Sequence, residues 1–139
     1  MSLKVWIIIG LLTGALAAPV FAAAGQDAVL AQYKTQAAAA DPAFAGFLAK
    51  RGAELYKSSN AAGGPDTPSC SSCHTASPLN VGMTRAGKAI EPMAVSASPN
   101  RFTDIAKTEK WFGRNCKTVL GRECTAQEKG DFITYLSGL

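Results

Sequence analysis

The chain has 139 residues, of which 47% are hydrophobic and 17% charged, and its formal net charge is +4. A chain of this length suits one domain with a core of its own, because it buries roughly two thirds of its unfolded surface. The charge is too small to indicate a nucleic-acid-binding protein, and the sequence contains no glycine-rich phosphate loop, internal repeat or long run of like charge.

The amino-terminal segment has the layout of a secretory signal. Lys4 precedes an apolar run over residues 5–18, and small residues follow it. Because the run is shorter than the roughly 20 apolar residues that span a bilayer comfortably, we predict a cleaved signal over residues 1–22, with a retained anchor as the alternative. The remaining residues, 23–139, are predicted to form a single exported, soluble domain, with the cleavage point uncertain by about two residues.

Two helices are predicted in the first half of the chain. Residues 27–40 are rich in alanine and carry apolar side chains at helical spacing. Asp41 and Pro42 then supply an N-cap and a first-turn proline for a second helix, which is predicted to run to about residue 59.

The middle of the chain has no clear period. Residues 58–69 have the composition of turns, and residues 70–102 remain rich in glycine, proline, serine and threonine. Such a long irregular stretch is uncommon in a compact domain unless something other than secondary structure orders it. A large bound cofactor would supply that order.

The last part of the chain is helical again. From Thr103, apolar residues recur at spacings of three and four, and Gly121 is suited to end this helix as a C-cap. Thr125 and Glu128 then form a capping box ahead of a last helix with an apolar face. No segment alternates convincingly as a strand, so the predicted fold class is all-α.

Residues 70–74 read Cys-Ser-Ser-Cys-His, which is the C-x-x-C-H pattern of c-type haem attachment. Two cysteine sulfurs on one helical turn can form thioether bonds to the two vinyl groups of a haem, and the next residue then lies under the iron. Cys70 and Cys73 are therefore the predicted attachment residues of one covalent haem c, and His74 is its predicted axial ligand. A thioredoxin-like pair would lie near a βαβ pattern, and a zinc site would need more ligands than this chain offers nearby.

The second axial position of the iron is left open, because His74 is the only histidine. Methionine is the usual partner of histidine in electron-transfer cytochromes, and Met83 and Met93 are both within reach along the chain. Asn115 is the third candidate, because the helical period puts its amide on the apolar stripe with Phe112, where an unpartnered amide costs roughly 1–3 kcal/mol. That amide could equally bond a loop backbone, and periodicity alone does not choose.

Three separate segments resemble a known family. They read PDTPSCSSCH from Pro65, RAGKAIEPMAVSASPNRFTD from Arg85, and EKWFGRNCKTVLGREC from Glu109. Together they resemble the sphaeroides haem protein family, a small group of bacterial monohaem c-type cytochromes related to cytochrome c-double-prime. The likeness covers residues 48–136, with the segments in the same order.

The resemblance implies a class I cytochrome c fold with an added N-terminal helix. It also implies that Asn115 is the sixth ligand of the ferric iron and that Cys116 and Cys124 form a disulfide. Phe112 is predicted to be a core residue that could also line the pocket beside Asn115. Disulfides persist in an oxidising compartment such as the periplasm, the location that the predicted export signal implies. Met93 stands where the relatives carry leucine, so a simple His/Met electron-transfer cytochrome c is kept as the alternative.

The function implied is that of an electron acceptor that also binds gas. An amide oxygen is a hard, weak donor that suits ferric better than ferrous iron, so Asn115 is expected to leave on reduction and let O2, CO or NO bind. We expect a carrier and gas binder rather than an enzyme, with reduction of oxygen, NO or peroxide left open. The expected partner is a dihaem c-type or membrane b-type cytochrome, and the chain is expected to be a monomer or weak dimer that binds no nucleic acid.

A second face of the helix from Thr103 is basic. Its members recur at spacings of three and four and are Lys107, Lys110, Arg114 and Lys117. This face is either an ordinary solvated helix surface or a docking surface for an acidic redox partner.

Overall fold

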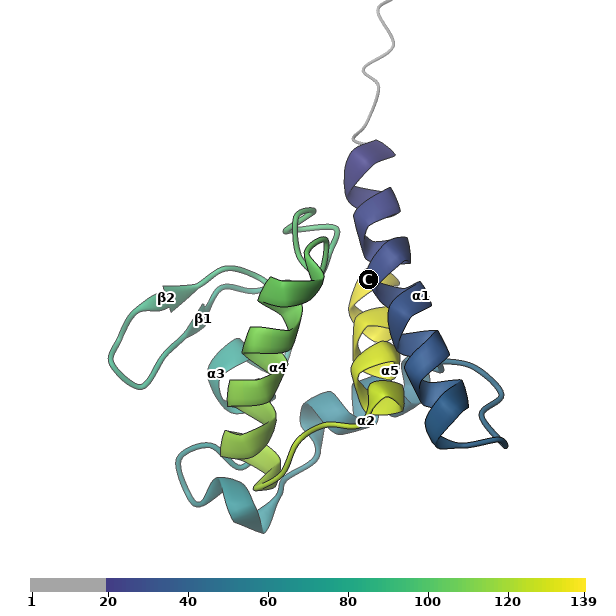
Figure 1. Cartoon of the computed structure of the whole chain (residues 1–139). Helices are drawn as coiled ribbons and strands as arrows, with labels where there is room; N and C mark the ends of the chain where they lie inside the picture. Colours follow the sequence, from purple (N-terminus) through teal and green to yellow (C-terminus); the bar gives the residue numbers. More distant parts are fainter. Residues whose placement is uncertain (1–19) are drawn as a thin grey trace, which may run out of the picture.

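The structure is a computed structural model that describes residues 20–139, and within that range it is mostly helical (Figure 1). In chain order the elements are α1 (Val20–Ala40), α2 (Ala49–Lys57), the short 3-10 helix η1 (Ala61–Gly63), α3 (Ser71–His74), β1 (Gly82–Met83), β2 (Ala89–Ile90), α4 (Ile105–Leu120) and α5 (Ala126–Ser137). The predicted all-α class is confirmed, and the small antiparallel β1–β2 hairpin is an unpredicted addition.

The predicted signal, residues 1–22, lies almost entirely outside the described residues. α1 begins at Val20, ahead of the predicted start at Asp27, because the preceding alanines also favour a helix. Between residue 20 and the carboxyl terminus, no helix is both long and apolar enough to cross a membrane.

α1 and α2 pack closely on α5, and α1 runs alongside α5 (Figure 1). At the crossing of α2 and α5, a Cβ atom at Gly52 would collide with the backbone of Asp131, so only glycine permits this approach. One turn later Tyr56 is fully buried, with its ring centre 6.0 Å from that of Phe132 and 5.9 Å from that of Tyr135. The close crossing therefore anchors Tyr56 in the core.

The predicted start of the second helix at Asp41 is wrong, because α2 begins only at residue 49. The Asp41 carboxylate accepts a hydrogen bond from the backbone N–H two residues on, at 2.8 Å, which forms a turn rather than a helix cap. Gly46 then adopts a φ of 114°, and the Leu48 N–H donates to Asp131 of α5 at 2.7 Å. Bonds to a distant element thus replace the expected helical ones.

The predicted C-cap of α4 and the predicted capping box of α5 are confirmed, and α4 starts two residues after the expected Thr103. Asp104 caps α4 by accepting a hydrogen bond from the Lys107 N–H at 2.8 Å, and Gly121 ends α4 in the left-handed conformation with a φ of 70°. Thr125 and Glu128 form the expected capping box at the start of α5. These local signals work because each bond lies within a few residues.

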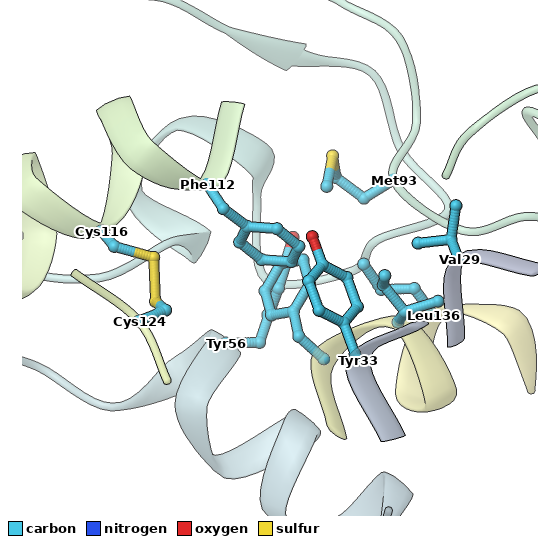
Figure 2. Packing of buried hydrophobic residues seen from close by; sticks show 10 residues of the cluster. Val29, Tyr33, Tyr56, Met93, Phe112, Cys116, Cys124 and Leu136 are labelled. Atoms are coloured by element: carbon cyan, nitrogen blue, oxygen red, sulfur yellow. A yellow bond between two sulfur atoms is a disulfide. The ribbon is translucent and has the colours of Figure 1, made fainter. Parts of the chain in front are cut away.

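Aromatic rings from several helices meet in the centre of the core (Figure 2). The ring centre of Phe112 on α4 lies 5.5 Å from that of Phe132 on α5 and 6.3 Å from that of Tyr33 on α1. Both contacts are edge-to-face, the arrangement that aromatic rings favour. The core therefore links α4 to both α1 and α5.

Candidate haem site

The C-x-x-C-H segment forms a single helical turn. Cys70 precedes α3, Cys73 lies within it, and both thiols are free and half-buried. A Cβ atom at Gly82 would collide with the backbone of Cys73 and His74, so β1 lies tightly against this turn. The structure thus brings the predicted attachment residues together on one rigid turn.

Tyr56 supports this turn from the core side. Its hydroxyl lies 2.9 Å from the carbonyl oxygen of His74 and 2.8 Å from that of Thr75, and it donates its proton between them. Thr75 itself has a φ of 65°, a left-handed conformation that is uncommon for a non-glycine residue. Sequence reasoning gave Tyr56 no part in the site, because nothing near it in the chain indicates this contact.

The imidazole of His74 is held in its neutral form. Burial, and secondarily the positive charge of Arg101, lower the pKa of its imidazole to about 4. Its Nδ1 atom is buried and has no hydrogen-bond partner among residues 20–139. A neutral imidazole with an uncommitted nitrogen, next to two free thiols on the same turn, fits the demands of a covalent haem.

Large apolar side chains are exposed on the segment that follows the attachment turn. Leu79, Val81 and Met83 expose 51%, 61% and 60% of their surface. Exposed apolar side chains gathered on one segment indicate a surface that binds something apolar. The faces of a porphyrin have that character, so this segment also fits the cofactor.

Phe112 and Asn115 lie on α4 as predicted, but only Phe112 is buried. The buried stripe of α4 consists of Thr108, Phe112, Cys116 and Val119. At about 100° per residue, Asn115 projects roughly 60° to one side of Phe112, at the edge of this stripe. The prediction that its amide points into the protein core is wrong, because Asn115 is exposed and no hydrogen bond to its amide occurs within the described chain.

The methionine candidates have different surroundings. Met93 is only 7% exposed and belongs to the cluster that contains Tyr33 and Phe112 (Figure 2). Its backbone N–H donates to the carbonyl of Pro78 at 2.8 Å. Met93 is therefore fixed within the packed core, whereas Met83 lies exposed on β1.

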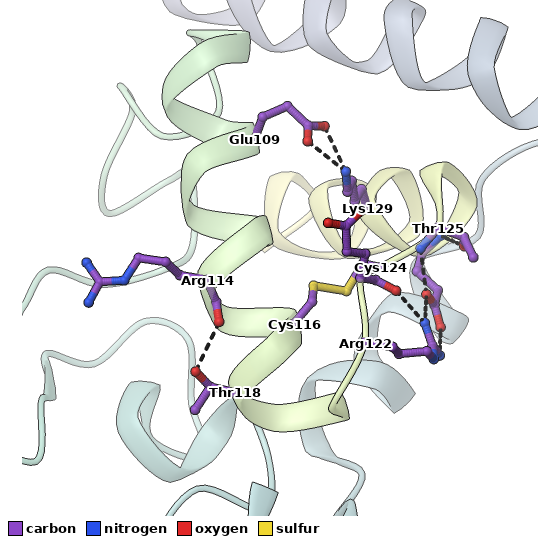
Figure 3. Close-up of a disulfide and its surroundings, with 10 residues drawn as sticks. Glu109, Arg114, Cys116, Thr118, Arg122, Cys124, Thr125 and Lys129 are labelled. Atoms are coloured by element: carbon purple, nitrogen blue, oxygen red, sulfur yellow. Dashed lines mark hydrogen bonds and ion pairs between the residues drawn. A yellow bond between two sulfur atoms is a disulfide. The ribbon is translucent and has the colours of Figure 1, made fainter. Parts of the chain in front are cut away.

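Cys116 and Cys124 are joined by a disulfide, with their Cα atoms 5.6 Å apart (Figure 3). The bond ties the last turns of α4 to the residue that precedes the Thr125 cap of α5. Asn115 is thus adjacent in sequence to a covalently fixed residue.

Arg101 is a half-buried cation that sequence reasoning missed. Its guanidinium donates to the carbonyls of Pro92 and Glu91, each at 2.6 Å, and burial lowers its pKa. Its own carbonyl accepts a hydrogen bond of 2.8 Å from Gln26 on α1. Because its charge also influences His74, Arg101 brings a positive charge to the site.

The basic face of α4 is exposed throughout its length. Lys117 pairs with Glu123 at 3.2 Å, and the Arg114 guanidinium lies 5.5 Å from the ring centre of Trp111. Lys107 and Lys110 take part in no ion pair with any described residue. The face is therefore a cationic surface that remains largely unneutralised.

Comparison with known proteins relates these residues to a family. A family model described as a domain of unknown function, DUF1924, matches residues 42–136. The cytochrome c-type protein SHP of Cereibacter sphaeroides is 47% identical over 128 residues, which cover 91% of this chain and 95% of that protein.

Solved structures show the same relationship to this family. The structure of oxidized SHP, described as an oxygen binding cytochrome c, aligns with a TM-score of 0.74 and 45% identity, covering 82% of this chain and 96% of that one. A solution structure of cytochrome c'' from Methylophilus methylotrophus, described as giving insights into the structural basis of haem-ligand detachment, aligns with a TM-score of 0.67 and 33% identity. That alignment covers 81% of this chain and 92% of the other.

Proposed function

The chain belongs to the family of the cytochrome c-type protein SHP, and from this premise we propose that it accepts an electron and then binds a diatomic gas, with Asn115 as the ligand that leaves. As a c-type cytochrome of this family it carries one covalently bound haem c. Haem c supplies an iron that changes between the ferric and ferrous states and takes two axial ligands.

The residues around α3 would hold this group. Cys70 and Cys73 would form the two thioether bonds, and the neutral imidazole of His74 would bind the iron. Tyr56 fixes the backbone on which His74 stands. Arg101 is the nearby cation whose charge suits the haem propionates, and a half-buried guanidinium gains from an anionic partner.

The exposed, unbonded amide of Asn115 is the observation that carries the proposal. An amide that already bonded protein groups would have to give up those bonds in order to reach an iron. Asn115 has none to give up among residues 20–139, and it lies one turn from the buried Phe112. Met93 is enclosed by core side chains, which favours a packing role for it.

The amide oxygen of Asn115 is a neutral, weak donor, so it would bind ferrous iron more weakly than ferric iron. Reduction would therefore release the side chain and free one axial position. The released amide N–H group could then donate a hydrogen bond to a bound gas. The descriptions of the two solved relatives, oxygen binding in one and haem-ligand detachment in the other, support this sequence of events.

Absorption spectra of the Asn115→Ala variant test the proposal. In the ferric state the variant should become high-spin, because the iron loses its sixth ligand, while the ferrous spectrum and its response to CO should persist. Met93→Leu is the matched control and should leave both spectra unchanged. A ferric spectrum that is indifferent to Asn115→Ala, or a methionine-to-iron charge-transfer band that Met93→Leu abolishes, would favour the simple His/Met carrier.

We propose further that the protein works after export, in the periplasm. The Cys116–Cys124 bond supports this location, because disulfides persist in oxidising compartments and are rare in the cytosol. The proposed redox partner is a protein with an acidic surface, which the cationic face of α4 would attract.

A further inference from the structure

α4 is joined to the rest of the molecule mainly through side chains. α1 and α2 pack closely on α5, whereas the closest backbone packing of α4 is on η1 at its carboxyl-terminal end (Figure 1). Three links join α4 to α5 and to the residues just before it: an ion pair from Glu109, an aromatic contact from Phe112 and the disulfide from Cys116. Figure 3 shows the ion pair and the disulfide. The position of α4 therefore depends on a few specific links.

The first of these links along α4, the ion pair of Glu109 with Lys129, has favourable hydrogen-bond geometry. The Lys129 ammonium donates to both carboxylate oxygens of Glu109, at 2.9 and 2.8 Å (Figure 3). The Lys129 side chain is 13% exposed and that of Glu109 is 42% exposed. A partly buried pair with two charge-assisted hydrogen bonds holds its two helices more firmly than an ordinary surface pair.

Tyr33 extends the link to α1. Its side chain is fully buried, and the Lys129 ammonium lies 5.5 Å from the centre of its ring. Burial, followed by the nearby Glu109 carboxylate, raises the pKa of the Tyr33 hydroxyl well above its ordinary value. We call Tyr33, Glu109 and Lys129 the three-helix clasp, because its members come from α1, α4 and α5.

The three-helix clasp and the disulfide bracket Asn115 along α4. At about 100° per residue, Glu109 and Cys116 lie within roughly 20° of each other, on the face toward α5. Asn115 projects from the flank of the helix, roughly 100° to 120° away from them. Two fixed points on one face set the rotation of a helix about its axis, so together they set the direction of the Asn115 amide.

We propose that Glu109 and Lys129 are positioning residues for Asn115, because their ion pair fixes the rotation of α4 and so the reach of the amide oxygen toward the iron. The inference rests on the proposed function. The clasp adds a noncovalent restraint at the start of α4 to the covalent one at Cys116. Loosening it would let α4 turn and would weaken the hold of Asn115 on ferric iron.

Azide binding to the ferric holoprotein tests the role of the clasp, because azide must displace Asn115. Lys129→Met keeps a flexible, unbranched side chain but removes the charge and both hydrogen bonds to Glu109. It should raise the azide affinity of the ferric protein roughly two- to thirtyfold, as expected for a coupling of this kind, and should increase the high-spin fraction of the ferric absorption spectrum. Lys129→Arg, which retains the ion pair, should restore both values.

Arg51→Gln is the matched control. It breaks the ion pair of Arg51 with Asp131, which joins α2 to α5 at 2.6 Å, so it costs stability without touching α4. Its azide affinity should remain that of the wild type. If Lys129→Met does not fold, Glu109→Gln tests the same link, because the half-exposed amide is readily solvated.

The Asn115→Ala background separates the two proposals. Lys129→Met should have no further effect on azide affinity there, since the group that it positions is gone. If Asn115→Ala changes the ferric spectrum but Lys129→Met leaves azide affinity unchanged, the positioning role is wrong and the proposed function stands. If Asn115→Ala itself changes nothing, the proposed function fails, and the positioning role fails with it.

Discussion

Tyr56 orders the haem-attachment turn although it lies on another helix. Its ring packs against Phe132 and Tyr135, and its hydroxyl donates a hydrogen bond that the carbonyls of His74 and Thr75 share. Burial is the main cause that raises the pKa of this hydroxyl, so it remains a protonated donor across the working pH range. A single residue thereby couples the aromatic core to the backbone of His74, the predicted iron ligand.

Removal of this hydroxyl should destabilise the protein. Tyr56→Phe leaves two carbonyl oxygens without their partner, which costs about 1–3 kcal/mol in the free energy of unfolding. Urea unfolding of the holoprotein, followed by far-ultraviolet circular dichroism, measures this loss. Tyr135→Phe is the control, because its hydroxyl makes no hydrogen bond with described residues. Equal losses in the two variants would show that the Tyr56 hydroxyl does not support the turn.

The residues of the site differ in how far the sequence could predict them. Cys70, Cys73 and His74 follow from their spacing alone, because covalent attachment requires them on one turn. The partners of the three-helix clasp could not be predicted, because 76 positions separate Tyr33 from Glu109 and no local pattern links them. The exposure of Asn115 was also misjudged, since periodicity locates a stripe but not its edge.

The limits of the helices are likewise predictable where a local cap sets them and unpredictable where a distant residue does. α4 ends at Gly121 and α5 begins after Thr125, as their capping signals predict, because each signal acts within one turn. α2 begins late, because the N–H of Leu48 donates to Asp131 of α5 instead of to a carbonyl of a continuing helix. Capping signals are therefore reliable only where the chain has no better tertiary partner.

The start of α5 should be sensitive to acid. Hydrogen bonds from Arg122, partly offset by burial and assisted by the Thr125 N–H, lower the pKa of Glu128 below its usual 4.5. Because the folded state favours the ionised carboxylate, this contribution to stability is complete above the ordinary pKa and is lost as the pH falls through the lowered one.

Glu128→Gln should therefore reduce the fall in stability between about pH 5 and pH 3, since the amide has no proton to take up. Urea midpoints measured across this range give the comparison. Glu123→Gln, at an exposed carboxylate in the same turn region, should retain the steep fall of the wild type. A pH profile that Glu128→Gln does not flatten would contradict the argument.

At the scale of the molecule, the charge is unevenly arranged. The cationic face lies on α4, the helix that also carries Asn115, so an acidic partner attracted to this face would arrive near the haem site. Such an arrangement favours fast encounter at low ionic strength, because long-range attraction guides the partner before contact.

Electron exchange with small charged complexes should reveal this asymmetry. With the anion ferrocyanide, the rate for the wild type should fall as ionic strength rises, and the double variant Lys110→Gln, Arg114→Gln should be slower by roughly two- to tenfold at low salt. Lys50→Gln with Lys57→Gln removes the same charge from α2 and should have a smaller effect. Equal slowing in both double variants would mean that net charge alone matters.

The fluorescence of Trp111 offers a probe of α4. It is 48% exposed, stands one turn before Asn115, and is the only tryptophan between residue 20 and the carboxyl terminus. A haem quenches indole fluorescence by energy transfer, with an efficiency that depends on distance and orientation. In a protein that lacks residues 1–22, all tryptophan emission would come from α4, so a change in its brightness on reduction would report a movement of this helix relative to the haem.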